Sequence, residues 1–355
     1  MKTPVISVVM PVRDGARWLG ATVNSIQVQT LSDFEFIIID DGSADDSLSI
    51  IEALTRGDTR VVIVRQPRLG LVAALNRGLA VARGELVARI DADDIAMPQR
   101  LERQSRYLEK HPEVGLLGTW AEEIDERGLV CGVRRPPSKP DELARLLTRT
   151  NPFLHSSIMM RKSVAQKAGS YRAAFEGAED YDLWLRMSEF TDTANMREYL
   201  LRYRVHPGSS SHSTRVRQLF SSRLAQRAAQ ARRTTGSDPT SQLSAPPDWH
   251  AKSCETAIYA DLARLYCLLD LANSANISCV KARSIDISPL VERDIVLSHA
   301  EREVAQLAIL NLLGDNVAAE ISRPLLIWHL LKLHPLRAIE LGYRSLWKEQ
   351  SSVSS

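Results

Sequence analysis

FEFIIIDDGS, residues 34–43, is an apolar run that ends directly on two aspartates. The same pattern returns at residues 86–94, LVARIDADD, where three aspartates fall within four positions. Short apolar runs bounded by turn residues are typical of buried strands in a parallel sheet, and carboxylates that follow such strands line the crevice where open α/β sheets bind ligands. Clustered aspartates repel one another unless a cation or hydrogen-bond donors share the site. The two stretches therefore predict a divalent ion and a diphosphate ligand at one edge of an α/β sheet.

Strand and helix patterns alternate in regular order over the first ~115 residues. We expect strands over residues 5–10, 35–39, 61–65, 86–90 and 114–118, and helices over residues 17–29, 45–55, 71–82 and 98–110. This order predicts a doubly wound parallel sheet with helices on both faces.

The pattern changes in the second half of the chain. After residue 120 it is mixed, with a strand-like segment at Ser157–Met160 and helical spacing at Asp180–Glu189. We expect an α/β domain over residues 1–214 and a helical C-terminal region over residues 215–355, with a Ser/Pro/Gly-rich linker near residues 236–248. The helices expected in that region are 216–233, 249–273, 291–313 and 324–349.

Composition excludes several classes of protein. The 355 residues carry a net charge of +2, which argues against a dedicated nucleic-acid binder. The four cysteines include no C-x-x-C pair, so neither a zinc cluster nor a disulfide framework is indicated. No basic-then-apolar leader opens the chain, and the most apolar stretch, Pro324–Leu333, is too short to span a bilayer. We expect a cytoplasmic protein that does not span a membrane, with peripheral contact at the inner membrane face as an open alternative.

The cluster at Asp91, Asp93 and Asp94 has two interpretations. Magnesium and manganese prefer oxygen ligands and are often held by one or two carboxylates plus substrate phosphates, whereas an isolated cluster of this kind usually caps a turn or a helix start. Its position after the fourth strand of a βα series favours the metal site. Asp40 also follows a strand and is placed to accept hydrogen bonds from a nucleobase edge. The polar residues after Gly42 fit a helix cap equally well.

Taken together, these stretches resemble the inverting family-2 nucleotide-sugar glycosyltransferases, which have the GT-A fold. The matching segments are SVVMPV (7–12), FEFIIIDDGS (34–43), ALNRGL (74–79), ARGE (82–85), DADD (91–94) and PQRLE with Gln104 (98–104). The likeness runs from about Val5 to Ser211. The chain departs from the family at Arg13-Asp14, where Tyr-Asn is frequent, and at Arg68, where Asn is frequent.

The resemblance implies a role for each matching residue. The base pocket, typically for uracil, is implied to consist of Pro11, Val12, Asp14 and Asp40. Arg83 is implied to lie near the nucleotide or its diphosphate, and Asp91 to face the ribose or the donor sugar. Asp93 is implied to ligate Mn2+ or Mg2+, with Asp94 nearby.

Glu179 and Asp180 supply an element that the first half lacks. An inverting transfer needs a base that deprotonates the acceptor hydroxyl while it attacks from the face opposite the diphosphate, and a carboxylate near that hydroxyl serves. Acids also favour the positive end of a helix, which is the simpler interpretation of an isolated pair. The resemblance includes an acidic pair here and implies that its second member, Asp180, is the base. Trp184 is expected to pack the helix onto the sheet, and Arg186 to orient the acids.

Two histidines and an arginine are further candidates. The segment Tyr203–Ser211 resembles the closing loop of the family, which implies that His206 is a third metal ligand or a diphosphate contact and that Arg204 clamps phosphate. A solvated turn at Pro207-Gly208 is the alternative. His155 also falls in a matching segment, although a lone histidine is more often structural.

An arginine-rich stretch follows. Between Arg197 and Arg233, nine arginines accompany one acid, Glu198. A solvated helix face is the usual explanation, and contact with the phosphates of a lipid-linked acceptor or a membrane surface is the functional one. Residues 324–347 mix Trp and Leu with basic side chains. That mixture fits an interfacial helix, and it fits better a helix packed on the catalytic domain or in a homodimer.

We therefore expect metal-assisted transfer of a sugar, with inversion, from a nucleotide-diphosphate donor to a hydroxyl of a saccharide or lipid-linked acceptor. The resemblance implies a UDP-linked donor and a role in cell-surface polysaccharide or glycolipid assembly. Two alternatives stay open. A nucleotidyltransferase would need a Gly-rich basic phosphate loop, for which PVRDG (11–15) is a poor match. A non-catalytic sugar-nucleotide-binding protein would not need the intact acids.

Overall fold

The computed structural model describes residues 3–206 and 215–248 of the chain. One compact unit comprises Met1–Thr214 and Ser221–Pro246 and contains the whole sheet of the described residues. None of the described helices is long and apolar enough to cross a membrane. The helices expected at 249–273, 291–313 and 324–349, and the loop expected beyond His206, lie outside the described residues. The division at residue 214 stays a prediction.

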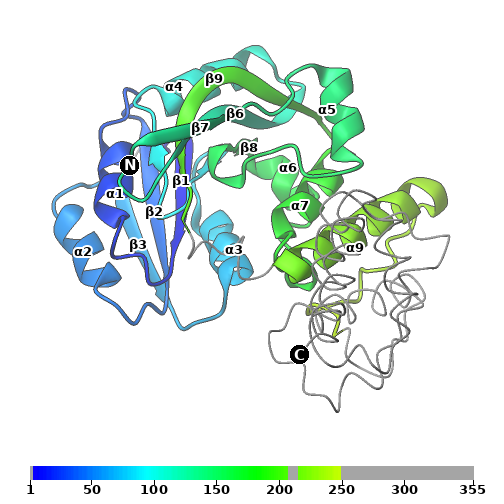
Figure 1. Cartoon of the computed structure of the whole chain (residues 1–355), viewed down its shortest axis with the longest axis horizontal. Helices are drawn as coiled ribbons and strands as arrows, with labels where there is room; N and C mark the ends of the chain where they lie inside the picture. Colours follow the sequence, from blue (N-terminus) through cyan, green and yellow to red (C-terminus); the bar gives the residue numbers. More distant parts are fainter. Residues whose placement is uncertain (1–2, 207–214, 249–355) are drawn as a thin grey trace, which may run out of the picture. The chain divides into compact units, whose positions relative to one another are not determined.

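Nine strands of the described chain form one mixed sheet (Figure 1). They are β1 (Ile6–Val12), β2 (Phe34–Asp41), β3 (Val61–Gln66), β4 (Leu86–Arg89), β5 (Ile95–Ala96), β6 (Val114–Ile124), β7 (Val130–Arg134), β8 (Met159–Arg161) and β9 (Asp192–Arg204). Their order is β3-β2-β1-β4-β8-β6-β9-β5, with β7 paired to β6. Strands β3, β2, β1 and β4 run parallel, which confirms the predicted parallel core.

Helices cover both faces of the parallel core (Figure 1). The described helices are α1 (Leu19–Gln27), α2 (Ser47–Leu54), α3 (Leu71–Val81), α4 (Arg100–Lys110), α5 (Pro140–Leu147), α6 (Lys162–Lys167), α7 (Glu179–Met187) and α9 (Arg215–Thr235), with 3-10 turns at His155–Ser157 and Ala173–Phe175. Val8 and Met10 of β1 pack in one core cluster with Leu19 of α1. On the opposite face, a Cβ added to Gly78 of α3 would lie 2.4 Å from a methyl carbon of Val9, so only glycine permits this close packing.

The sheet differs from the expected one beyond β4. Strand β8 lies between β4 and β6 and is antiparallel to both, so β6 does not join the parallel core directly. Strand β6 also continues past Gly118 to Ile124 and pairs with β9 along most of its length. The expectation that residues 114–118 add a fifth strand to the parallel core is therefore wrong. The pairing of this strand depends on partners far away in sequence, which local periodicity does not encode.

Candidate active site

Four residues implied to form a base pocket lie at one edge of the sheet. Val12 and Asp40 are direct partners in the parallel register of β1 and β2, and Pro11 pairs with the residue before Asp40. Asp14 follows in the loop that leaves β1. The structure therefore brings Pro11, Val12, Asp14 and Asp40 together, and their contact with a base stays a prediction.

Hydrogen bonds join the loops that follow β1 and β2. The Asp14 amide donates to Ser43 Oγ at 3.1 Å, and the Ala44 amide donates to Asp14 Oδ1 at 2.7 Å. The Ala16 amide donates to Asp45 Oδ2 at 3.1 Å. Asp14 has a φ of 51°, a left-handed conformation that aspartate tolerates when its side chain is bonded locally. The two loops beside Asp40 are consequently held together by hydrogen bonds in both directions.

The two adjacent aspartates at the end of β2 have different surroundings. Asp41 accepts the Gly70 amide at 2.9 Å, so its carboxylate fixes the loop between β3 and α3. Gly42 has a φ of 68°, and a Cβ there would lie 2.9 Å from the backbone nitrogen of Arg68. Asp41 thus has a structural role, while Asp40, buried beside it, is the one left as a candidate base contact.

The second aspartate cluster fits a divalent cation. One potential ligand atom from each of Asp91, Asp93 and Asp94 lies within 4.8 Å of the others. Asp94 is 1% exposed; its Oδ1 accepts the Arg204 amide at 2.8 Å, and its Oδ2 is buried with no hydrogen-bond partner. Burial and the charges of Asp91 and Asp93 raise the pKa of Asp94 well above its usual value. Hard carboxylate oxygens with an unpartnered buried atom suit Mn2+ or Mg2+.

A buried arginine that the sequence analysis missed stands behind this cluster. Arg89, 3% exposed at the end of β4, donates from both terminal nitrogens to the two carboxylate oxygens of Asp91. Its carbonyl accepts a guanidinium N–H of buried Arg100 at 2.7 Å. Burial raises the pKa of the Asp91 carboxyl, and the Arg89 charge opposes that rise. A single charged residue inside the apolar run LVARI was the signal available in the sequence.

His206 and Arg204 border the cluster from β9 and its end. His206 Nε2 lies 3.1 Å from Asp93 Oδ2, and its ring centroid is 4.3 Å from that of Trp18, which the sequence analysis did not single out. Arg204 donates from Nε to the Asp93 carbonyl at 2.8 Å and from Nη1 to the Asp125 carbonyl at 2.9 Å. We therefore reinterpret Arg204 as a support of the aspartate loop rather than a phosphate clamp.

The acidic pair stands at the first turn of α7. The Asp180 carboxylate accepts the Asn151 side-chain amide at 2.7 Å and the Tyr181 backbone amide at 2.7 Å. Glu179 accepts the Gly177 amide at 2.8 Å. Burial and the neighbouring Asp180 charge raise the pKa of Glu179 to about 7, and burial raises the pKa of Asp180. A buried carboxylate with a raised pKa can accept a proton from a substrate.

The pair and the aspartate cluster share one electrostatic environment. The negative charge of Asp180 contributes to the raised pKa of Asp91. The positive charge of Arg89 lowers the pKa of Asp180 and of Glu179. Acids far apart in the sequence therefore meet around one buried arginine.

His155 lies next to Asp180 but is held by aromatic side chains. Its Nε2 is 3.0 Å from the Tyr171 hydroxyl, its ring meets the Trp184 ring edge to face at 5.7 Å, and its Nδ1 is 4.0 Å from Asp180 Oδ2. Burial and the Arg89 charge keep its pKa well below the usual value. A neutral histidine packed in this way is a structural neighbour of the pair, in line with the simpler expectation.

The expected position of Arg83 is wrong. Its Nε donates to Glu35 Oε2 at 2.7 Å and its amide to Glu35 Oε1 at 2.6 Å. Glu35 pairs with Ser7 at the amino end of the parallel strands, whereas Asp40 lies at the carboxyl end. Five residues of strand separate the two ends by about 16 Å. Arg83 follows α3 and precedes β4, so it belongs to the edge of the sheet opposite Asp40 and the expected base pocket.

Comparison with known proteins adds a family. Residues 7–169 match Glycosyl transferase family 2. The chain is 37% identical over 190 residues to the putative glycosyltransferase EpsE of Bacillus subtilis. The aligned region covers 52% of this chain and 67% of EpsE. It is 34% identical over 215 residues to the O-antigen biosynthesis glycosyltransferase WbnJ of Escherichia coli. That aligned region covers 59% of this chain and 83% of WbnJ.

Solved structures show the same fold at low sequence identity. TarS 1–349 of S. aureus in complex with UDP-GlcNAc is 16% identical with a TM-score of 0.55, over 96% of this chain and 91% of that one. The mannosyltransferase PcManGT of Pyrobaculum calidifontis, in complex with GDP-Man and Mn2+, is 18% identical with a TM-score of 0.52, over 98% of this chain and 88% of that one.

Proposed function

This chain belongs to glycosyl transferase family 2 and is a glycosyltransferase, and on that premise we propose that it transfers a sugar with inversion from a UDP-linked donor to an acceptor hydroxyl. One observation carries the proposal. The turn His155–Ser157 contacts both sets of acids. The Asp91 amide donates to Ser156 Oγ at 2.9 Å, and His155 Nδ1 lies 4.0 Å from Asp180 Oδ2, so an acid suited to an acceptor and an acid suited to a donor lie beside the same turn. An inverting displacement needs this arrangement, because the attacking hydroxyl and the leaving diphosphate lie on opposite faces of the sugar.

We propose Asp93, Asp94 and His206 as the residues that hold Mn2+ or Mg2+. The unpartnered buried oxygen of Asp94 and the short contact between His206 and Asp93 support this assignment. Asp91 is proposed to face the ribose or the donor sugar, because its side chain is 34% exposed and Arg89 orients its carboxylate. A cation bound at this site neutralises negative charge on a departing diphosphate.

Asp180 is the proposed base. Its Oδ2 is oriented by the Asn151 amide at 2.7 Å, and its Oδ1 by the first turn of α7. Burial raises the pKa of Asp180, which increases its affinity for a proton, and the charge of Asp180 in turn helps to raise the pKa of Glu179 to about 7. Asp180 then accepts the hydroxyl proton as the oxygen attacks the anomeric carbon.

The setting follows from relatives. WbnJ is named for O-antigen biosynthesis. We therefore propose that this chain acts in cell-surface polysaccharide or glycolipid assembly, with a saccharide or a lipid-linked saccharide as acceptor.

The test is a donor screen with the full chain. UDP- and GDP-sugars are incubated with free or lipid-diphosphate-linked saccharides and Mn2+, Mg2+ or a chelator, and release of the nucleoside diphosphate is measured. We expect one UDP-sugar to turn over with metal. Asp180→Asn should lose turnover while UDP with Mn2+ still raises its Tm, and Asp141→Asn, at an exposed position of α5, is the matched control.

Two results would contradict the proposal. The first is no turnover of any donor together with a Tm that UDP and Mn2+ leave unchanged. The second is release of pyrophosphate from UTP and a sugar 1-phosphate, which would identify the alternative nucleotidyltransferase.

A further inference from the structure

Helix α9 contacts the chain on both sides of the acidic pair. Ser221 Oγ donates to the Glu176 carbonyl at 2.8 Å, three positions before Glu179. Gln226 Nε2 donates to the Tyr181 hydroxyl at 3.3 Å, directly after Asp180. The entry to α7 and its first turn are therefore both bonded to α9.

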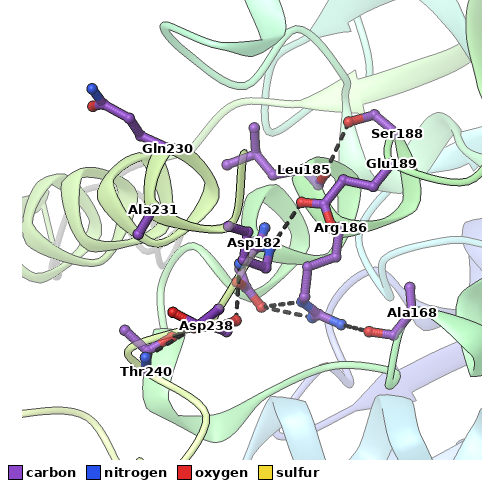
Figure 2. Close-up of polar contacts among 12 residues, drawn as sticks. Ala168, Asp182, Leu185, Arg186, Ser188, Glu189, Gln230, Ala231, Asp238 and Thr240 are labelled. Atoms are coloured by element: carbon purple, nitrogen blue, oxygen red, sulfur yellow. Dashed lines mark hydrogen bonds and ion pairs between the residues drawn. The ribbon is translucent and has the colours of Figure 1, made fainter. Parts of the chain in front are cut away.

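An ion-pair network extends this attachment (Figure 2). Asp182 of α7 is 0% exposed and is gripped by Arg186, whose Nη2 lies 2.6 Å from Asp182 Oδ2, and by Arg172, whose Nε lies 3.0 Å from the same oxygen. Arg172 also donates from Nη1 to Asp238 Oδ2 at 2.9 Å. Asp238 lies in the turn after α9, so the buried acid of α7 is linked to that turn through one guanidinium.

A second arginine links the same turn to the other end of α7. Arg232 of α9 donates from Nη1 to Asp238 Oδ2 at 2.9 Å and from Nε to Glu189 Oε1 at 2.8 Å. Thr240 donates from its amide at 2.8 Å and from its hydroxyl at 2.6 Å to Asp238 Oδ1. Burial opposes ionisation of Asp238, but the Thr240 hydrogen bonds and the Arg172 charge outweigh it and lower its pKa to about 2.

We propose that Ser221, Gln226, Arg232 and Asp238, which we call the α9 latch, are positioning residues for Asp180. The inference rests on the proposed role of Asp180 as base. Helix α7 has nine residues, too few to hold its own conformation without tertiary contacts. A misplacement of about 1 Å can cost on the order of 100-fold in rate. The latch fixes α7 at its entry, at its first turn and at its end, and so fixes the carboxylate that faces the acceptor.

The α9 latch also changes the interpretation of the arginine-rich stretch. Arg232 is committed to Glu189 and Asp238, and Arg202 pairs with Glu122 through Nε at 3.0 Å. Arg204 is buried against the aspartate loop. Part of the charge run that suggested phosphate binding is therefore either paired with acids of this chain or buried. The α9 latch and the acidic pair both lie after residue 169, where the family match ends.

The test uses Asp238→Asn in the full chain, with Thr240→Val and Thr240→Ser as a milder pair. Asparagine keeps the size of the side chain but leaves Arg172 and Arg232 facing a neutral group. Glu52→Gln is the matched control, because it removes the exposed Glu52–Arg65 ion pair, which is far from α7 and α9 in the sequence. Hydrogen exchange of residues 176–187 and steady-state kinetics are measured on each.

In Asp238→Asn we expect faster hydrogen exchange in residues 176–187 and a kcat at least tenfold lower, with donor KM changed less than twofold. Thr240→Val should show a smaller effect on both exchange and kcat. Thr240→Ser and Glu52→Gln should behave like the wild type. Unchanged exchange would overturn the proposal, and so would faster exchange with an unchanged kcat. An inactive wild-type chain would refute the proposed function instead, and hydrogen exchange would still decide whether α9 holds α7.

Discussion

Substituting Arg89 with methionine tests whether one buried guanidinium makes the aspartate cluster compatible with folding. Arg89 is 3% exposed and donates to both oxygens of Asp91. Removing one partner of a buried ion pair costs about 3–5 kcal/mol, because the other charge is left uncompensated. The Asp91 side chain is 34% exposed, so water screens part of its charge. We therefore expect the lower end of the range, a loss of about 3 kcal/mol in the free energy of unfolding.

The assay is thermal and urea unfolding of the metal-free full chain. A loss of that size corresponds to a fall of roughly 6–12 °C in Tm for a unit of this length. Arg89→Met combined with Asp91→Asn removes the stranded charge together with its partner and should recover about 2 kcal/mol. Arg89→Lys keeps the positive charge but loses the two parallel hydrogen bonds to Asp91, so its free energy of unfolding should lie between those of the wild type and Arg89→Met. Strictly additive losses in the double variant would refute the reasoning, because they would mean that Arg89 contributes through packing alone.

Four further substitutions address the site. Glu179→Gln removes an acid whose charge is coupled to that of Asp180, so the pH at which kcat rises should fall in a pH–rate profile; an unchanged profile would show that the two acids titrate independently. Asp180→Asn should lower kcat on the order of 100- to 10,000-fold at unchanged donor KM in steady-state kinetics, and full activity would exclude it as the base. Asp94→Asn removes a buried carboxylate, so the metal-free Tm should rise while the Tm gain on adding Mn2+ shrinks; a full gain would exclude Asp94 as a ligand. Arg83→Gln should lower the free energy of unfolding, measured in urea, by about 1.5 kcal/mol through its lost bond to Glu35, and should leave donor KM unchanged. A raised KM would support the original assignment of Arg83 to the nucleotide site.

The sequence predicted the parts of the site that follow from strand ends. Asp40 and Asp91 come directly after apolar runs, and the carboxyl ends of parallel strands meet at one edge, so their proximity was predictable. Arg83 was misplaced because its assignment rested on the resemblance alone, whereas a residue just before β4 lies at the amino end of that parallel strand. Its true neighbour, Glu35, is identified only by the pairing of β1 with β2.

Other features depend on contacts that sequence patterns do not carry. Arg89 was hidden because an arginine in an apolar strand has no evident partner until Asp91 folds back onto it. The ring contact between Trp18 and His206 joins two loops that are distant in sequence. The three-residue strand β8 gave a strand signal at Ser157–Met160, but its antiparallel place between β4 and β6 is a property of the assembled sheet.

That three-residue strand limits how the protein can be re-engineered. Met159–Arg161 is the only described segment that pairs with β4 on one side and with β6 on the other. A chimera that grafts the second half of a relative after residue 96 would replace the strand bonded to the edge of β4, together with the two buried methionines that fill the space beside it. A chimera made to exchange acceptor preference should therefore keep residues 159–161 together with the first half of the chain. Otherwise the relative that supplies the second half needs side chains of equal volume at these positions.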